Sequence, residues 1–241
     1  MTFSRMLVKF SGESLGGSTG VGIDPDVLSN MAGQIAGLVA TGVETGVVVG
    51  GGNLFRGQDL AGHGVDRIAG DHMGMLATVM NALALKSALV SAGAAAEVLS
   101  AHRIATIAEG FSVAKARRLL DSGHVVLYAG GTGSPLFTTD TAACLRAIET
   151  GAEVVVKSTR VDGVYSDDPE KDAAAQRYDR LDYGEVLAQE LAVMDFAAIC
   201  LCRDHDLPII VCDVAEPDAL TRIARGDKVG TRIDGRGERG P

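Results

Sequence analysis

Three glycine-rich segments, each directly after an apolar run, most constrain what this chain can fold into. The runs and their glycines span residues 5–13, 44–57 and 125–140. Each run is typical of a buried strand, so three loops are predicted at the strand ends of one sheet. Glycine lets backbone N–H groups approach phosphate oxygens closely, and Lys9 and Arg56 add positive charge beside two of the segments. The pattern predicts a phosphate-binding site assembled from distant parts of the sequence.

Strand-like and helix-like segments alternate along the chain, which favours a mostly parallel sheet covered on both faces. Strands are expected at residues 5–10, 44–49, 95–99, 125–129, 153–157 and 208–211, and helices at residues 25–41, 71–92, 113–122, 140–150, 191–206 and 216–225. Asp24 is the expected N-cap of the first helix, with Pro25 at its first position. The predicted fold is α/β, a three-layer αβα sandwich. One domain is expected over residues 1–233, followed by a flexible tail at residues 234–241.

Composition excludes several classes of protein. The 241 residues are 46% hydrophobic, enough for one substantial core, and a net charge of -9 disfavours nucleic acid as the main partner. No apolar run reads as a membrane span, and residues 1–5 lack the layout of a secretion signal, so a cytoplasmic protein is expected. The four cysteines form no C-x-x-C pair and the five histidines lack ligand spacing, which predicts reduced thiols and no structural zinc.

The glycine segments match neither of the best-known nucleotide-binding patterns. None has the spacing of a P-loop, and residues 50–53 are not a dinucleotide fingerprint. Taken singly, each cluster is as compatible with a tight turn as with a phosphate cradle. Together with the nearby cations, the three favour the phosphate reading.

Longer motifs resemble the amino acid kinase superfamily, and within it the bacterial uridylate kinases. The resemblance runs from Arg5 to about Thr231 and is carried chiefly by residues 9–13 (Lys-Phe-Ser-Gly-Glu), 50–57 (Gly-Gly-Gly-Asn-Leu-Phe-Arg-Gly) and 70–81. It continues in residues 131–133, 138–140, 161–165, 193–195 and 202–204. It implies transfer of the ATP γ-phosphoryl group to UMP, giving UDP and ADP for pyrimidine nucleotide biosynthesis.

The same resemblance assigns roles to individual residues. The catalytic set is Lys9, Asp140 and Asp195. The ATP-binding set is Lys9, Phe10, Ser11, Gly12, Gly52, Arg56, Thr159, Tyr165 and Asp168. The UMP-binding set is Gly51, Asp71, Thr132, Gly133, Ser134, Pro135, Leu136, Phe137, Thr138 and Thr139. Activation by GTP is tied to Gly17, Ser18, Thr19, Gly20, Val21 and Gly22. The resemblance also implies Mg²⁺ held on the nucleotide without a firm protein ligand, inhibition by UTP and a homohexamer.

Elementary chemistry supports these roles independently. The phosphate of a nucleoside monophosphate is already an anionic nucleophile near neutral pH, so no strong general base is needed. Catalysis then depends on alignment and on neutralising repulsion between two phosphate groups. Lys9, at the end of a strand, is the first choice for stabilising transition-state charge. Asp140 and Asp195 would orient Lys9 or hold metal-bound water, unless Asp140 only caps the helix after it.

Other assigned residues also have ordinary structural interpretations. Asp71 could cap a helix or accept hydrogen bonds from the ribose hydroxyls, and Arg56 could be a solvated loop arginine or a phosphate ligand. Tyr165 could pack in the core or lie against adenine. The aspartates from Asp162 to Asp172 lack the spacing of an EF-hand calcium loop, which favours a solvated loop except at Asp168.

Three places depart from the uridylate kinase pattern. Ser134 replaces the usual asparagine in the acceptor segment, Cys212-Asp213 replaces Phe-Asn, and Ala101-His102-Arg103 is more polar than its counterpart. These departures leave open a kinase of the same fold that acts on another small acceptor, such as a modified nucleotide, an amino acid or carbamate. A third hypothesis is a non-catalytic nucleotide-binding or storage protein.

Overall fold

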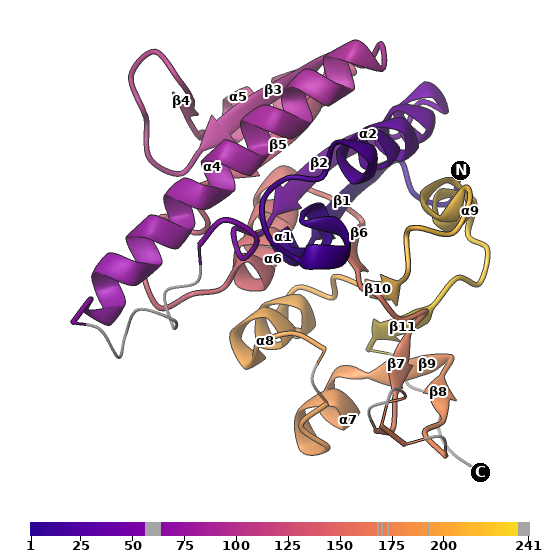
Figure 1. Ribbon diagram of the computed structural model, residues 1–241. Coiled ribbons are helices and arrows are strands. Elements are labelled where there is room, and N and C mark those ends of the chain that lie inside the picture. Colours follow the sequence, from indigo (N-terminus) through magenta and orange to yellow (C-terminus); the bar gives the residue numbers. More distant parts are fainter. Residues whose placement is uncertain (56–63, 168, 170, 173, 192, 236–241) are drawn as a thin grey trace.

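A nine-stranded sheet forms the centre of the computed structural model (Figure 1), which describes residues 1–55, 64–167, 169, 171–172, 174–191 and 193–235. The strand order is β4-β3-β5-β2-β1-β6-β10-β11-β9, and every pairing is parallel except that of β10 with β11. The strands are β1 (Arg5–Phe10), β2 (Glu44–Val49), β3 (Ala96–Ser100), β4 (Glu109–Gly110), β5 (Val125–Ala129), β6 (Val154–Ser158), β9 (Arg180–Asp182), β10 (Ile209–Cys212) and β11 (Thr231–Asp234). A separate antiparallel pair joins β7 (Val164–Tyr165) to β8 (Arg177–Tyr178).

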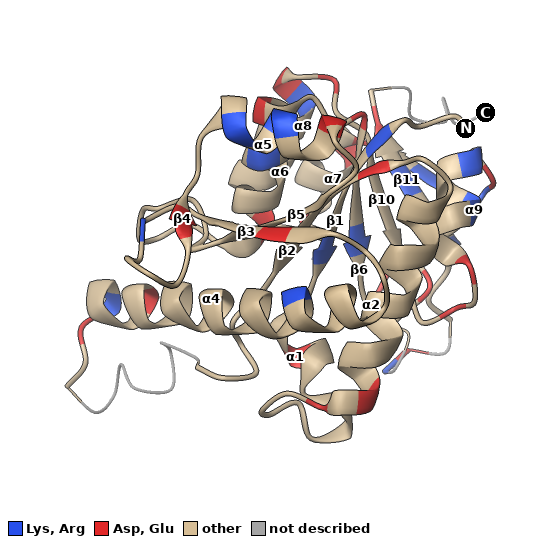
Figure 2. Ribbon diagram, turned by 90° about the horizontal axis from the view of Figure 1, so that it is seen from above, with Lys and Arg blue, Asp and Glu red and all other residues tan. Residues whose placement is uncertain are grey.

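Helices cover both faces of the sheet (Figure 2). One layer contains α2 (Pro25–Ala40), α4 (Arg67–Ser91) and α9 (Ala219–Arg225), and the other contains α5 (Val113–Asp121), α6 (Thr139–Thr150), α7 (Tyr183–Ala188) and α8 (Phe196–Asp204). Side chains of β1 alternate between the two cores, with Met6 and Val8 in the first and Leu7 in the second. The predicted three-layer αβα sandwich is therefore confirmed.

Helix boundaries follow capping side chains more closely than apolar periodicity. Asp24 caps α2 as predicted, accepting from the N–H groups of residues 26 and 27. The cap of α4 is Asp66, so this helix begins before the predicted residue 71. The cap of α8 is Asp195, so the expected helix at residues 191–206 is wrong for its first five residues.

Short elements account for most of what the sequence did not predict. These are β4, β7, β8, β9, β11, α7, the four-residue helix α1 (Gly12–Leu15) and the 3₁₀ turn Gly17–Thr19. Each has too few residues to establish a hydrophobic period. β4 and β9 form the two edges of the large sheet, and β11 lies beside β9.

Helix α4 corrects the expectation that no apolar run is long enough to span a membrane. Among the described residues it is the one helix whose length and composition meet that criterion. Length and composition do not separate a membrane span from a helix of a soluble core. Here Ala77, Leu85 and Leu89 are buried over the sheet, whereas Leu76 and Met80 are exposed.

Candidate active site

The glycine-rich segments meet beyond the carboxyl ends of neighbouring parallel strands, as predicted. The N–H of Gly50 donates to the carbonyl of Phe10 at 3.0 Å. A Cβ on Gly12 would lie 2.6 Å from both the Gly50 oxygen and the Gly52 nitrogen. A Cβ on Gly50 would lie 3.5 Å from the hydroxyl oxygen of Thr139, in the third segment. The three backbones approach so closely that Gly12 has no room for a side chain.

A buried carboxylate between two lysines lies at this edge. Lys9 and Lys157 are register partners on β1 and β6, whose lysine-bearing ends are blue in Figure 2. Asp140 on α6 is 8% exposed; its Oδ1 lies 2.6 Å from Lys9 Nζ and its Oδ2 lies 2.8 Å from Lys157 Nζ. Lys157 also donates to the carbonyl of Val193. Two cations therefore share one carboxylate, so these three groups together carry one net positive charge.

The ionisation of this group reflects competition between burial and pairing. Burial opposes the charged form of Asp140, but Lys9 and Lys157 outweigh it and hold the pKa of this carboxyl below its usual value. Burial lowers the pKa of Lys157, an effect that attraction to Asp140 offsets only in part and that the charge of Lys9 reinforces. The carboxylate is thus charged at neutral pH.

Capping does not explain Asp140. The N-cap of α6 is Thr138, whose hydroxyl accepts from the N–H groups of Asp140 at 3.0 Å and Thr141 at 3.3 Å. The capping alternative for Asp140 is therefore wrong, because its carboxylate faces the lysines. Asp195 caps α8 and accepts hydrogen bonds from the hydroxyls of Thr138 and Thr141, the latter at 2.7 Å. Among the described contacts, none joins Asp195 to Lys9.

A cavity of about 530 Å³ opens on the Lys157 side of the site. Thr159 and Tyr165, which the resemblance assigns to the adenosine end of ATP, line it. The Tyr165 hydroxyl donates to Asp162 at 2.6 Å, which fixes the ring at the cavity wall. Asp168 lies outside the described residues.

A smaller cavity of about 160 Å³ lies on the other side, beneath α4. Six residues of the predicted UMP set or its flanks line it: Gly51, Asp71, Gly131, Ser134, Phe137 and Thr139. Asp71 is inside α4 and is not its cap, which corrects the capping alternative. Its carboxylate accepts from the N–H of Leu136 at 2.7 Å and from Nε of Arg67 at 2.8 Å. The acceptor segment is thereby fastened to α4.

Comparison with known proteins agrees with this geometry. The model of the amino acid kinase family matches residues 4–213. The chain belongs to the amino acid kinase family. Curated relatives named uridylate kinase include one from Shewanella loihica, 55% identical over 96% of this chain and 94% of its own, and one from Legionella pneumophila strain Corby, 55% identical over 97% and 95%. The UMP kinase structure from Bacillus anthracis aligns with a TM-score of 0.94 at 36% identity, covering 98% of this chain and 97% of its own.

Not every residue assigned by the resemblance presents its side chain to these cavities. Phe10 is 1% exposed and packs in the core, so only its backbone is available to a ligand. Pro135 and Leu136 belong to the acceptor segment but do not line the small cavity. Arg56 lies outside the described residues.

Sequence reasoning missed two groups in this amino acid kinase fold. Lys157 ends an apolar strand just as Lys9 does, a signal that was present in the sequence. Asn81 of α4 is fully buried, donates to the Gly50 carbonyl at 2.7 Å and exchanges side-chain hydrogen bonds with Asn53 at 2.7 and 3.1 Å. An asparagine within a helix gives no such signal without the fold.

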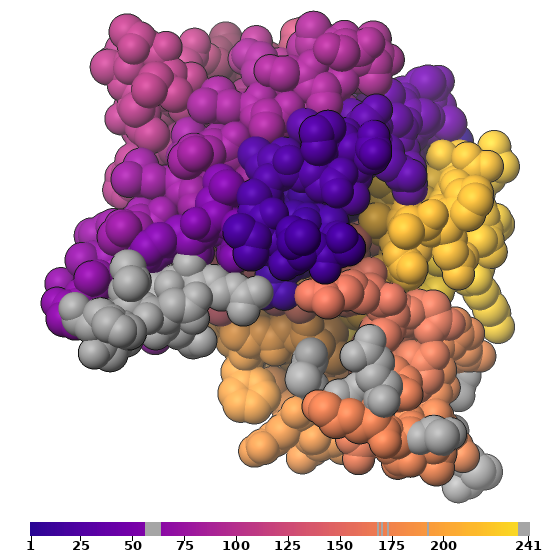
Figure 3. Space-filling view, in the orientation of Figure 1, coloured from indigo at the N-terminus to yellow at the C-terminus, as the bar shows by residue number. Residues whose placement is uncertain are grey.

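The segment tied by resemblance to GTP adjoins the second glycine loop. Asn53 Nδ2 donates to the Gly22 carbonyl at 2.6 Å, and the Gly22 N–H donates to the Asn53 carbonyl at 2.9 Å. Figure 3 shows the indigo N-terminal region against the coral segment near residue 160. Between these two regions, Arg160 pairs with Glu13 at 3.0 Å. The segment at residues 17–22 is therefore joined through Gly22 to the loop that follows β2.

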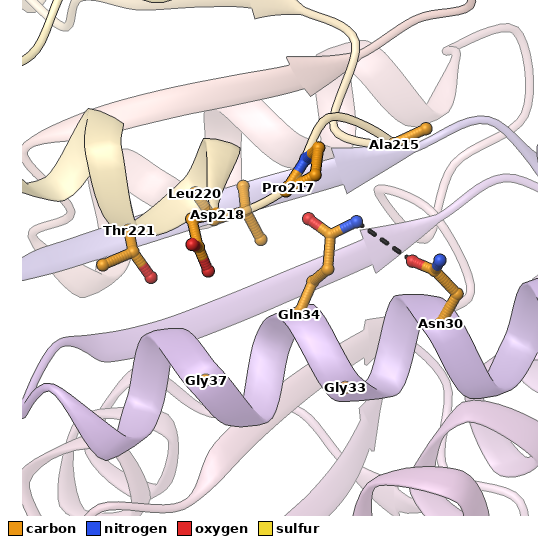
Figure 4. A pocket seen from close by; sticks show the side chains of 9 residues that line it. All are labelled: Asn30, Gly33, Gln34, Gly37, Ala215, Pro217, Asp218, Leu220 and Thr221. Atoms are coloured by element: carbon orange, nitrogen blue, oxygen red, sulfur yellow. Dashed lines mark hydrogen bonds between the residues drawn. The ribbon is translucent and has the colours of Figure 1, made fainter.

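A further cavity of about 330 Å³ lies between α2 and the start of α9 (Figure 4). Gln34 projects from α2 toward it and donates to Asn30 Oδ1 at 3.0 Å. None of the described residues that line this cavity is a lysine or an arginine. Its chemistry does not suit a phosphate, and it is separate from the three loops.

Proposed function

We propose that this chain transfers the γ-phosphoryl group of ATP to the phosphate of UMP, giving UDP and ADP. The observation that carries the proposal is Asp140 between Lys9 and Lys157 at the border of the two cavities. Lys157 lines the larger cavity, and Thr139, next to Asp140 in sequence, lines the smaller one. Relatives named uridylate kinase share about 55% of its residues over nearly its whole length.

The reaction follows from this placement. An oxygen of the UMP phosphate attacks the γ-phosphorus of ATP, and the bond from that phosphorus to the β-phosphate oxygen breaks, leaving ADP. Lys9 and Lys157 stabilise charge on the transferring oxygens, while backbone N–H groups of the glycine loops orient both phosphates. Asp140 holds the two ammonium groups in place against their mutual repulsion.

Magnesium would enter bound to the phosphates of ATP and neutralise part of their charge. Among the described residues, no group of three or more His, Cys, Asp or Glu could hold a metal ion. Asp140 is already engaged by two lysines. The donors present therefore fit a nucleotide-bound ion with water and phosphate ligands.

We propose further that copies of the chain assemble through the exposed side of α4. Ile68, Met73, Leu76, Met80 and Val90 are all more than 40% exposed there. Several exposed apolar side chains on one helix favour an interface. The homohexamer, activation by GTP, inhibition by UTP and a cytoplasmic role in pyrimidine synthesis rest on the family resemblance.

The test is nucleoside diphosphate formation by the purified protein with ATP and Mg²⁺, offering UMP, CMP, dUMP and GMP separately. Selective UDP formation, lost in Lys9→Ala, is expected. Turnover of another acceptor would support the alternative of a same-fold kinase with different specificity. Tight nucleotide binding without any turnover would support the storage-protein alternative.

A further inference from the structure

His102 belongs to the segment that departs from the uridylate kinase pattern, and it contacts the acceptor loop directly. Its Nε2 lies 2.9 Å from the carbonyl oxygen of Gly133. A carbonyl oxygen can only accept, so Nε2 must carry the proton, in the neutral or the charged ring. The hydrogen bond joins the turn after β3 to the loop after β5.

The peptide unit between Gly133 and Ser134 is held at both ends. His102 fixes its carbonyl, and the hydroxyl of Thr132 accepts from the N–H of Ser134 at 3.1 Å. Gly133 has φ +91°, a conformation in which glycine rotates with little steric cost. Without both anchors this peptide unit could flip and carry Ser134 away from the small cavity that it lines.

The other anchors of the acceptor loop act elsewhere along it. The N–H of Gly130 donates to the Thr78 hydroxyl at 2.8 Å, and the N–H of Leu136 donates to Asp71 at 2.7 Å. Both partners belong to α4 and hold the ends of the loop. His102 contacts the middle of the acceptor loop from the turn after β3. The fit is close there, because a Cβ on Gly133 would lie 3.3 Å from the Cβ of Ala101, the residue before His102.

We propose that His102 is a positioning residue for the phosphate acceptor, acting through the Gly133–Ser134 peptide unit. The proposal rests on the UMP kinase function proposed above. His102 does not line the acceptor cavity, so it affects the acceptor only through the loop. The ATP side, built from Lys157, Thr159 and Tyr165, has no part in this contact.

Three variants test the N–H donor rather than the bulk of the side chain. His102→Met removes the donor, whereas His102→Gln places an amide donor near the position of Nε2. The control is His124→Ala, which removes a histidine at the opposite end of β5, where its ring contacts Ser122. Loss of one hydrogen bond predicts a KM for UMP raised between about twofold and tenfold in His102→Met. The kcat and the KM for ATP are expected to stay near wild type, because only acceptor binding is weakened. His102→Gln and His124→Ala should match the wild type.

Equal KM values for UMP in His102→Met and His102→Gln would overturn the proposal. So would a parallel rise in the KM for ATP with a lowered Tm, which indicates a general structural role. The dissociation constant of UMP, measured by titration calorimetry, separates this inference from the proposed function. If the wild type binds UMP but forms no UDP, the proposed function fails. The dissociation constants of UMP from His102→Met and His102→Gln would still decide the role of His102.

Discussion

We expect Asp140 to be central to the proposed site, because this single buried carboxylate pairs with two neighbouring lysines and neutralises only one of them. The remaining positive charge is available to a transferring phosphoryl group. An isosteric amide at this position would remove the carboxylate that contacts both ammonium groups and leave only the more weakly acting charge of Asp195 near Lys157. Stability and turnover are therefore linked at one side chain.

Asp140→Asn is expected to lower the free energy of unfolding by about 3 kcal/mol or more, since breaking a buried pair leaves uncompensated charge. The kcat should fall by at least about 100-fold, the scale expected when a preorganised electrostatic group is lost. Urea denaturation and a UDP-forming assay measure the two effects. Asp121→Asn is the matched control: Asp121 pairs with Arg5 on the surface and should change stability by less than about 1 kcal/mol. A variant at Asp140 as stable as this control would contradict the prediction.

The acid dependence of stability should also carry the signature of Asp140. Its pKa is lower in the folded protein than in the unfolded chain, where an aspartate carboxyl has a pKa of about 3.9. Below that value the unfolded chain takes up a proton that the folded protein resists, so the stabilisation present at neutral pH is lost as the pH falls through the folded pKa. The stability difference between wild type and Asp140→Asn should shrink below about pH 4. A difference independent of pH down to acid unfolding would refute this assignment.

At the scale of elements, the first loop is limited by space rather than by charge. Gly12 is the first residue of α1, and there the chain lies directly against the backbone of the second glycine loop at Gly50 and Gly52. A methyl group there would contact backbone atoms that cannot move aside as a side chain can. The first glycine loop and the glycine loop that follows β2 would therefore have to move apart.

Gly12→Ala is expected to reduce ATP binding by at least about tenfold and to destabilise the fold by about 1–3 kcal/mol, the range typical of overpacking. Gly33→Ala on α2 is the matched control, since a Cβ there meets nothing within 4 Å. In a helix interior this change should be stabilising by about 0.5–1 kcal/mol. Calorimetric titration of ATP and thermal unfolding of both variants decide the point; equal ATP affinities would show that Gly12 is not limited by its neighbours.

The sequence predicted β1, β2, β5 and β6 and the loops after them because each contains an apolar run that ends close to a glycine or a lysine. It misplaced the start of α8 because Val193 and Met194 are apolar and buried, yet lie in a loop before the cap Asp195. It overlooked α7 although Asp182 and Glu185 form a capping box at its start. The link between Asp140 and Lys157 depends on how β6 lies beside β1, which local sequence does not reveal.

At the scale of the whole molecule, α4 has two different sides. One packs on the sheet and carries Asp71, Thr78 and Asn81 to the glycine loops, and the other is apolar and exposed at Met73, Leu76 and Met80. A partner copy bound on the outer side would therefore touch the same helix that fastens the acceptor loop.

Met80→Glu should raise the dissociation constant of the assembly by at least about tenfold, because a two-fold interface would bring like charges together. Light scattering after size exclusion measures the mass, with circular dichroism to show that the fold is retained. Ala114→Glu adds the same charge to an exposed position on α5, in the other helical layer, and should leave the mass unchanged. An unchanged mass for Met80→Glu would place the interface elsewhere.

The central position of β1 has a consequence for how the protein is made. β1 leaves the ribosome before the other strands of this sheet, yet it lies between β2 and β6, and β6 begins only at Val154. Until that point is synthesised, one edge of β1 lacks its native partner, and an open apolar edge invites pairing with other chains. Truncated products that stop before Val154 should aggregate, so premature termination harms this protein more than its small size suggests.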